Sequence, residues 1–208
     1  MNSKLFYKVM AGFYDLIDVI YFRNYKRSPR KIVLDAINDT DRVLDLCTGT
    51  ATNAMRIAKT KPASKVIGID LSKDMLRVAK SKAKKADVQN IRLYHMDATK
   101  MKFRDCCFDK ILISLVLHEV EEELAGRILE EAKRVLKDDG EIIVTEWEKS
   151  EKTLQKILFF PISILEPKPF KAFIKKDLHQ CFEKLGFAVV LEYHCDYSKV
   201  LVLKKMRE

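Results

Sequence analysis

The stretch VLDLCTGTATN, residues 43–53, decides the fold. Its first four residues predict a short buried strand with an acid at Asp45, and a turn of small residues then leads into a helix that opens at Ala54. A strand, a tight turn and a helix N-terminus form a corner where backbone N–H groups point at a ligand. Gly49 has no Cβ, so we expect a ligand to approach the backbone most closely there. The stretch therefore predicts a cofactor pocket.

Downstream of this corner, short apolar strands alternate with amphipathic helices. The further strands are expected at 65–70, at 91–96 near a sheet edge, at 108–117 and at 141–147. Ser72 is expected to cap one helix, and the helix before the last of these strands is expected to end at Gly140. Repeated β-α units require parallel strands with right-handed crossovers.

Two more strands, 187–194 and 199–203, follow a helix ended by Gly186 and are joined by a short link. This spacing predicts an antiparallel hairpin at the edge of the sheet. The expected fold class is therefore α/β, with a doubly wound, mostly parallel seven-stranded sheet and a C-terminal antiparallel hairpin strand.

Composition narrows the class of protein. The 208 residues suit one domain spanning 1–208. The net charge of +9 is spread over lysines along helices, so nucleic acid is an unlikely partner. None of the five cysteines forms a Cys-x-x-Cys pair, so we expect no metal site. No signal peptide and no apolar run of bilayer length are visible, which predicts a cytoplasmic protein.

Two segments lie outside the strand and helix rhythm. Residues 1–38 read as helical, with a second helix start at Ser28-Pro29, and form either a helix packed on the core or a lid whose Tyr14 closes over the cofactor. Residues 148–176 are apolar but broken by prolines. They form either a connector tucked against the core or a cap over an acceptor, and 154–171 is a possible place of peripheral membrane contact.

The chemistry is expected at the carboxyl ends of the strands, where ligands bind in open α/β sheets. Asp70 ends the second strand, and its two oxygens can accept both hydroxyls of a ribose. The third strand is followed by Asp97, which can take an adenine amino group, and by Ala98, which leaves room for the ring. The fourth strand is expected to end in the stretch from Ser114 to His118. Together these positions predict an adenosine-type site.

Residues 40–147 resemble the class I S-adenosylmethionine-dependent methyltransferases, most closely the ubiquinone/menaquinone biosynthesis group. The supporting segments are VLDLCTGT (43–50), VIGIDLS (66–72), MDA (96–98) and FDKILIS (108–114). The acidic-x-Gly-x-Gly-x-Gly loop of that family falls on Asp45, Cys47, Gly49 and Ala51, so one of three glycines is kept. The resemblance implies a Rossmann-like methyltransferase fold and S-adenosyl-L-methionine as cofactor. The predicted cofactor-binding residues are Asp45, Cys47, Thr48, Gly49, Thr50, Asp70, Leu71, Met75, Asp97, Ala98 and Ser114.

The resemblance also implies methyl transfer to a small-molecule or lipid-like acceptor, such as a quinone precursor. His118, after the fourth strand, is the candidate general base, and Tyr14 is the second candidate to contact a ligand. A histidine that caps the next helix is the alternative for His118. The alternative functions are a phospholipid head-group N-methyltransferase and a non-catalytic cofactor-binding regulator.

Overall fold

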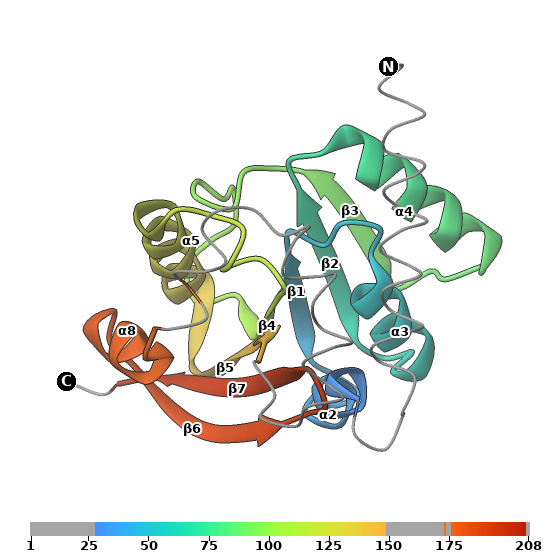
Figure 1. Cartoon of the computed structure of the whole chain (residues 1–208). Helices are drawn as coiled ribbons and strands as arrows, with labels where there is room; N and C mark the ends of the chain where they lie inside the picture. The colour runs from blue at the N-terminus through green and yellow to red at the C-terminus, as the bar shows by residue number, and fades with distance from the viewer. Residues whose placement is uncertain (1–27, 149–172, 174–175, 207–208) are drawn as a thin grey trace.

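The computed structural model describes residues 28–148, 173 and 176–206, and these residues form a seven-stranded sheet in the order β3-β2-β1-β4-β5-β7-β6 (Figure 1). The first five strands in this order pair in parallel, and β7 pairs antiparallel with both β5 and β6. The strands are β1 Arg42–Leu46, β2 Lys65–Asp70, β3 Ile91–His95, β4 Phe108–Ser114, β5 Leu136–Trp147, β6 Phe187–His194 and β7 Ser198–Lys205. The predicted fold class, the edge position of the third strand and the C-terminal hairpin are confirmed.

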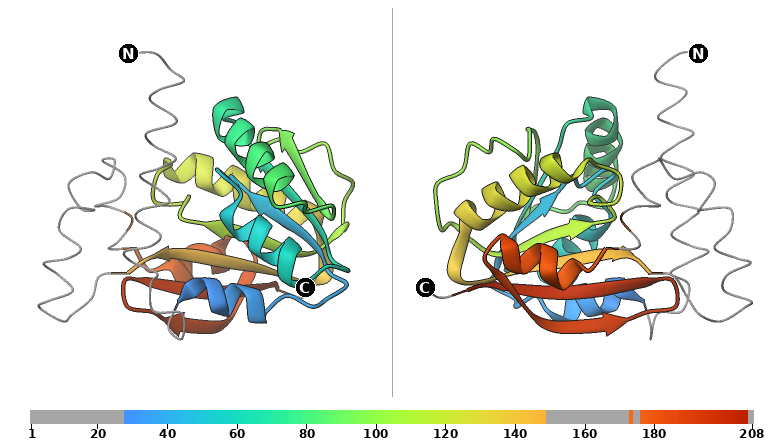
Figure 2. Two further views of the ribbon diagram at one scale, coloured as in Figure 1. Left: turned by 90° about the vertical axis from the view of Figure 1, so that its right-hand side faces the viewer. Right: turned by 60° about the vertical axis from the view of Figure 1, so that its left-hand side comes forward.

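Helices cover both faces of the sheet, as a doubly wound fold requires (Figure 2). They are α2 Pro29–Asp35, α3 Thr52–Thr60, α4 Lys73–Lys85, α5 Glu122–Val135 and α8 Leu178–Lys184. One apolar core joins α5 and α8 to the sheet, and a second joins α2, α3 and α4 to the opposite face. The inner strands β1, β2, β4, β5 and β7 alternate their side chains between the two cores and are apolar on both faces, whereas the edge strands β3 and β6 are largely exposed.

Helix ends follow the capping residues that the sequence indicated. The hydroxyl of Ser28 accepts a hydrogen bond from the Arg30 N–H with Pro29 in the first helical position, and the hydroxyl of Ser72 accepts one from the Met75 N–H. Gly186 follows α8 with a φ of +76°, a left-handed conformation that glycine adopts without steric cost. These three predicted boundaries are confirmed.

Gly140 does not end a helix, so that prediction is wrong. Helix α5 ends at Val135, β5 begins at the next residue, and the φ of Gly140 is not positive. A Cβ at position 140 would lie 2.7 Å from Leu136 Cδ1 and 2.9 Å from the Asp109 carbonyl oxygen. Glycine is required there because β5 passes close to neighbouring atoms, and not because a helix terminates.

The structure changes one predicted strand boundary and leaves most of two predicted segments outside the described residues. The fourth strand ends at Ser114, three residues earlier than predicted, because Leu117 and the residue after it form a turn. The N-terminal segment before Ser28, with Tyr14, lies outside the described residues, as does most of the predicted cap at 148–176.

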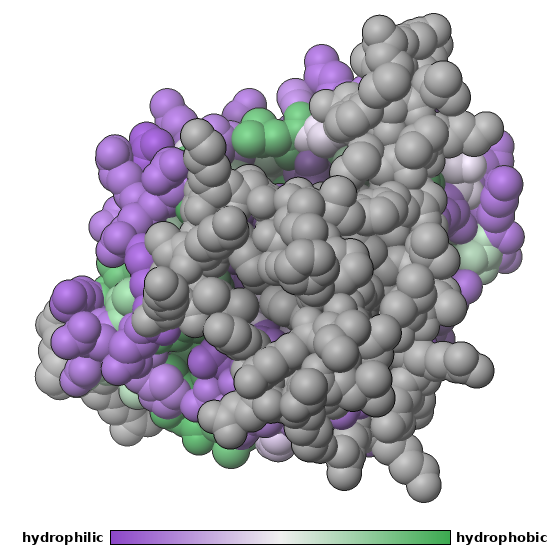
Figure 3. Space-filling model, viewed as in Figure 1, coloured by the Kyte–Doolittle hydropathy of each residue, from purple (hydrophilic) through white to green (hydrophobic). Residues whose placement is uncertain are grey.

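Among the described residues, no helix combines the length and the apolar character needed to cross a bilayer. The described surface on the face in Figure 3 is mainly hydrophilic.

Replacing Gly140 with Ala should lower the free energy of unfolding by about 1–3 kcal/mol, because the added methyl group meets a carbonyl oxygen that cannot move aside. Gly126 is the matched control, since it lies inside α5 with no atom within 4 Å of an added Cβ. Gly126→Ala should raise the free energy of unfolding by up to about 1 kcal/mol through helix propensity. Urea unfolding of both variants checks this, and equal effects would contradict it.

Candidate cofactor site

The loop between β1 and α3, residues 47–51, has left-handed backbone at every second residue. The φ angles are 53° at Cys47, 55° at Gly49 and 62° at Ala51. These are the three positions where the acidic-x-Gly-x-Gly-x-Gly pattern places glycine, the residue that tolerates this conformation best. A Cβ at Gly49 would meet no atom of the described residues within 4 Å, so no described residue fills the space in front of it. The loop keeps the shape of a glycine-rich turn although only one glycine remains.

Asp45 holds the loop from beneath. Its side chain is buried, accepts a hydrogen bond from the Thr48 hydroxyl at 2.5 Å, and also accepts one from the Ala54 N–H at the start of α3. The Thr48 N–H in turn donates to the Ile69 carbonyl of β2 at 2.9 Å. Burial raises the pKa of Asp45 to about 6, although both hydrogen bonds oppose the shift. Asp45 therefore anchors the turn and does not face the open space.

Asp70, at the end of β2, holds the loop from the side. One carboxylate oxygen accepts from the Gly49 N–H at 2.8 Å, and the other accepts from the Ser72 N–H at 2.7 Å. The same side chain thus joins the loop after β1 to the start of α4. Asp70 is only partly buried, so it remains within reach of a ligand in the space before Gly49.

The strand ends converge on Cys47. Burial raises the pKa of its thiol to about 12, and the negative charges nearby, in decreasing order of effect, add to this shift: Asp70, Asp45, Glu119 and Asp97. These carboxylates follow or end β1, β2, β3 and β4, so four strand ends meet around one loop. The thiol is held neutral, which fits a space-filling role for Cys47 and not that of a nucleophile.

The residues predicted to bind the adenosine follow β3 or lie near the start of α4. Asp97 is exposed, and one of its oxygens accepts from both the N–H and the hydroxyl of Thr99 at 2.8 Å. Ala98 lies behind it in the core. Leu71 has 65% of its surface exposed, and Met75 is half-buried in the first turn of α4. An exposed leucine beside a half-buried methionine offers apolar surface on which a flat ring can lie.

Two predicted residues have partners that the sequence did not reveal. The Asn53 amide, in the first turn of α3, donates to the Ser114 hydroxyl at 3.0 Å and so links the loop to the end of β4. The Thr50 hydroxyl accepts from Lys82 Nζ at 3.1 Å and is directed toward α4. Thr50 therefore contributes its backbone more readily than its side chain. Asn53 was missed, and its only signal was an amide at the start of the helix after the loop.

His118 forms a buried pair with Glu146. The His118 Nδ1 atom lies 2.5 Å from a Glu146 oxygen, and the two side chains are 1% and 0% exposed. The other Glu146 oxygen accepts from the N–H groups of Val116 and Leu117 at 3.1 and 2.8 Å. His118 does not cap the next helix, because Glu121 is the N-cap of α5, so that alternative is wrong. Glu146 was missed, although an acid in the apolar strand 141–147 was a visible signal.

The raised pKa of Asp45 has a consequence for stability. The folded protein holds the Asp45 proton more tightly than the unfolded chain, so the free energy of unfolding should fall as pH rises from about 4 to about 6. The free energy of unfolding falls by about 3 kcal/mol over this range and shows no further change from Asp45 at higher pH. Asp45→Asn lacks it, so the variant should gain stability relative to the parent between pH 4 and pH 7. Urea unfolding at several pH values measures the difference, and parallel pH curves would contradict it.

The sequence of this chain is similar to those of known methyltransferases. A family model described as a methyltransferase domain matches residues 37–201. The demethylmenaquinone methyltransferase of Staphylococcus saprophyticus is 36% identical over 140 residues, which cover 66% of this chain and 58% of that protein. The enzyme of the same name from Listeria welshimeri is 33% identical over 141 residues, covering 67% and 59%. The chain thus spans less than two thirds of the length of these relatives.

Solved structures agree on the fold. A SAM dependent methyltransferase from Aquifex aeolicus superposes with a TM-score of 0.75 at 21% identity, covering 95% of this chain and 97% of that one. The mitomycin 7-O-methyltransferase MmcR gives a TM-score of 0.69 at 16% identity, covering 85% and 53%. A loop with open space at Gly49, ringed by acids from four strand ends, is consistent with both comparisons. The chain belongs to the class I S-adenosylmethionine-dependent methyltransferases.

Proposed function

We propose that this protein transfers a methyl group from S-adenosylmethionine to a quinone-type small molecule. The observation that carries the proposal is that Asp70 holds the Gly49 N–H and that four acidic side chains act on Cys47 in the same loop, in a chain whose net charge is +9. A local excess of negative charge favours a ligand with a sulfonium and an ammonium group. The relatives named demethylmenaquinone methyltransferases support the class of acceptor.

The residues present fit this cofactor. Asp70 offers carboxylate oxygens for ribose hydroxyls, Leu71 and Met75 offer apolar surface for the adenine, and Asp97 offers an oxygen for its amino group. Gly49 leaves its backbone open to close approach. When bound, S-adenosylmethionine supplies an electrophilic methyl group on its sulfonium. The chain then has to orient the acceptor and exclude water.

Asp70→Ala should weaken binding of S-adenosylmethionine by about 1.5–3 kcal/mol, because a charged hydrogen-bond acceptor is lost and the Gly49 N–H loses its anchor. Isothermal titration calorimetry measures this. Asp74→Ala is the control, since Asp74 lies close in sequence, in the first turn of α4, but pairs with Arg77. An unchanged affinity in Asp70→Ala would remove Asp70 from the cofactor site.

We further propose His118 as the general base. The Glu146 carboxylate accepts a hydrogen bond from Nδ1–H and so keeps the second ring nitrogen, Nε2, as the basic one. Nε2 would take the proton of an acceptor hydroxyl, and the resulting phenolate makes a ring carbon electron-rich enough to accept the methyl group. The C–CH₃ bond would form as the S–CH₃ bond breaks and the neutral sulfide leaves, and the ring carbon would then lose its hydrogen as a proton to restore the aromatic ring. Because His118 is buried, its proton partner would be a ligand enclosed with it and not bulk water. Tyr14 stays a second candidate for a ligand contact.

The full chain should methylate a demethylated naphthoquinol with a short isoprenoid tail, detected by mass spectrometry as a product one methyl heavier. His118→Ala should lower kcat by about 100- to 10,000-fold with cofactor affinity unchanged. Glu146→Gln should lower kcat as well, because an amide in place of the carboxylate can donate to Nδ1 and leave the proton on Nε2. Glu123→Gln, on the exposed face of α5, should have no effect.

Each other outcome has a distinct meaning. Methylation of phosphatidylethanolamine vesicles but not of the quinol would show a phospholipid head-group enzyme, in keeping with membrane contact through 154–171. Cofactor binding with no transfer to either acceptor would show a cofactor-binding regulator. Activity of His118→Ala equal to that of the parent would remove the general base from the mechanism. The cytoplasmic location stays a prediction.

A further inference from the structure

A second cluster of potential ligand atoms lies away from the cofactor loop. Glu148, Glu192 and His194 each offer one oxygen or nitrogen atom, and these atoms all lie within 4.8 Å of one another. We propose that these three residues bind one divalent transition-metal ion of the Zn²⁺ type. The proposal does not depend on methyl transfer.

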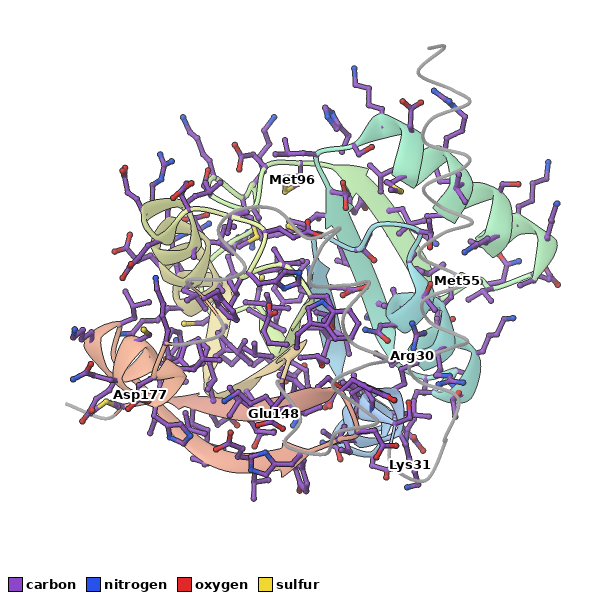
Figure 4. All side chains as sticks on the ribbon, viewed as in Figure 1. Arg30, Lys31, Met55, Met96, Glu148 and Asp177 are labelled. Carbon is purple, nitrogen blue, oxygen red and sulfur yellow. The ribbon has the colours of Figure 1, made fainter. Side chains whose placement is uncertain are left out.

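The fold places the three side chains together from two separate parts of the sequence. Glu192 and His194 are two residues apart on β6, so they point to the same face of the sheet. Glu148 directly follows β5, and its N–H donates to the Tyr197 carbonyl at 3.0 Å, in the link between β6 and β7. Figure 4 shows Glu148 over this hairpin. The backbone therefore fixes the spacing of the cluster.

The contacts within the cluster suit a metal as well as a proton. His194 Nδ1 lies 2.9 Å from both oxygens of Glu148. A metal between them would take the place of the proton that now bridges nitrogen and carboxylate, and that proton would leave to solvent or to the other ring nitrogen. Glu148 and Glu192 are mostly buried, with 27% and 23% of their side chains exposed. Partial burial limits competition from water.

Neighbouring residues orient the third ligand. One Glu192 oxygen lies 2.7 Å from His179 Nε2 on α8, and the other accepts from Lys199 Nζ at 3.2 Å. A histidine bonded to a ligating carboxylate is a common supporting contact in metal sites. Lys199 competes with the ion for Glu192, yet two carboxylates against one lysine leave a net negative charge when both imidazoles are neutral.

The set of ligands selects the kind of ion. One imidazole nitrogen with two carboxylates matches the nitrogen and oxygen ligands that Zn²⁺ takes in sites with three protein ligands. Ca²⁺ takes six to eight oxygen ligands, more than this cluster offers. Mg²⁺ is a hard cation that prefers oxygen, so the His194 nitrogen favours a transition metal over it. The ion would tie the chain where it leaves β5 to the edge strand β6. Because Lys199 is the register partner of both His194 and Glu146, the backbone of His194 lies two strand spacings, about 10 Å, from that of Glu146.

Titration calorimetry of the full chain with ZnCl₂ tests the proposal, in a Cys106→Ser background because Cys106 is exposed and its thiol could bind zinc by itself. We expect one saturable site, with weak binding of Ca²⁺ and Mg²⁺. His179→Ala should weaken Zn²⁺ binding about 10- to 100-fold, and His194→Ala should weaken it more. Glu183→Gln, an exposed acid on α8, should leave the affinity unchanged.

A second measurement guards against variants that disturb the fold. Zn²⁺ should raise the thermal unfolding midpoint of the parent but not of His194→Ala, whose side chain is 65% exposed and is not needed for packing. Lys199→Gln should bind Zn²⁺ more tightly, because a competing cation is removed. No saturable site, or equal affinity in the parent and in His194→Ala, would overturn the proposal. Loss of methyl transfer in another variant would not bear on it.

Discussion

The site depends on one constraint, which is that the chain turns from β1 into α3 through three left-handed residues. Such a turn costs about 1–2 kcal/mol at each residue that is not glycine. Two carboxylates compensate: Asp45 accepts from the Thr48 hydroxyl and the Ala54 N–H, and Asp70 accepts from the Gly49 N–H. The turn is therefore formed by backbone geometry and by side chains from the ends of β1 and β2. A ligand meets a surface that is already arranged.

Basic and acidic side chains lie in different parts of this molecule. The basic excess lies along solvated helices, as on α4, where lysines alternate with apolar residues. The acidic residues that matter for the site follow the carboxyl ends of the parallel strands and surround Cys47. The net charge of +9 therefore does not describe the charge near the loop. The local arrangement points toward a cationic cofactor, because nearby charges act more strongly on a ligand than distant ones, which salt screens.

Local patterns in the sequence predicted the fold and the loop well, since strand length, turn residues and capping residues act over a few positions. Asp70 was found because the end of a strand is itself a local feature. The pair of His118 and Glu146, separated by 28 residues, was not found, because it depends on the register of β4 against β5. The contact of Asn53 with Ser114, 61 residues apart, depends on how α3 lies on the sheet.

The misassigned Gly140 has the opposite cause. A glycine that follows an amphipathic pattern is typical of a helix end. This local signal was misleading, because the glycine is required by crowding against Leu136 and Asp109. Close approach of distant atoms leaves no mark on the neighbouring sequence. For the same reason, the cluster of Glu148, Glu192 and His194 has no recognisable spacing in the chain.

The left-handed angles at Cys47 and Ala51 bear on how such proteins are found by sequence. Replacing glycine at these two positions strains the turn, and a domain that is stable by about 5–15 kcal/mol can absorb that strain. At position 49 a side chain would also fill the space before the backbone, where a ligand would lie. A pattern search that demands all three glycines would therefore pass over chains whose pocket is intact, whereas one that requires only the middle glycine and the preceding acid would keep them.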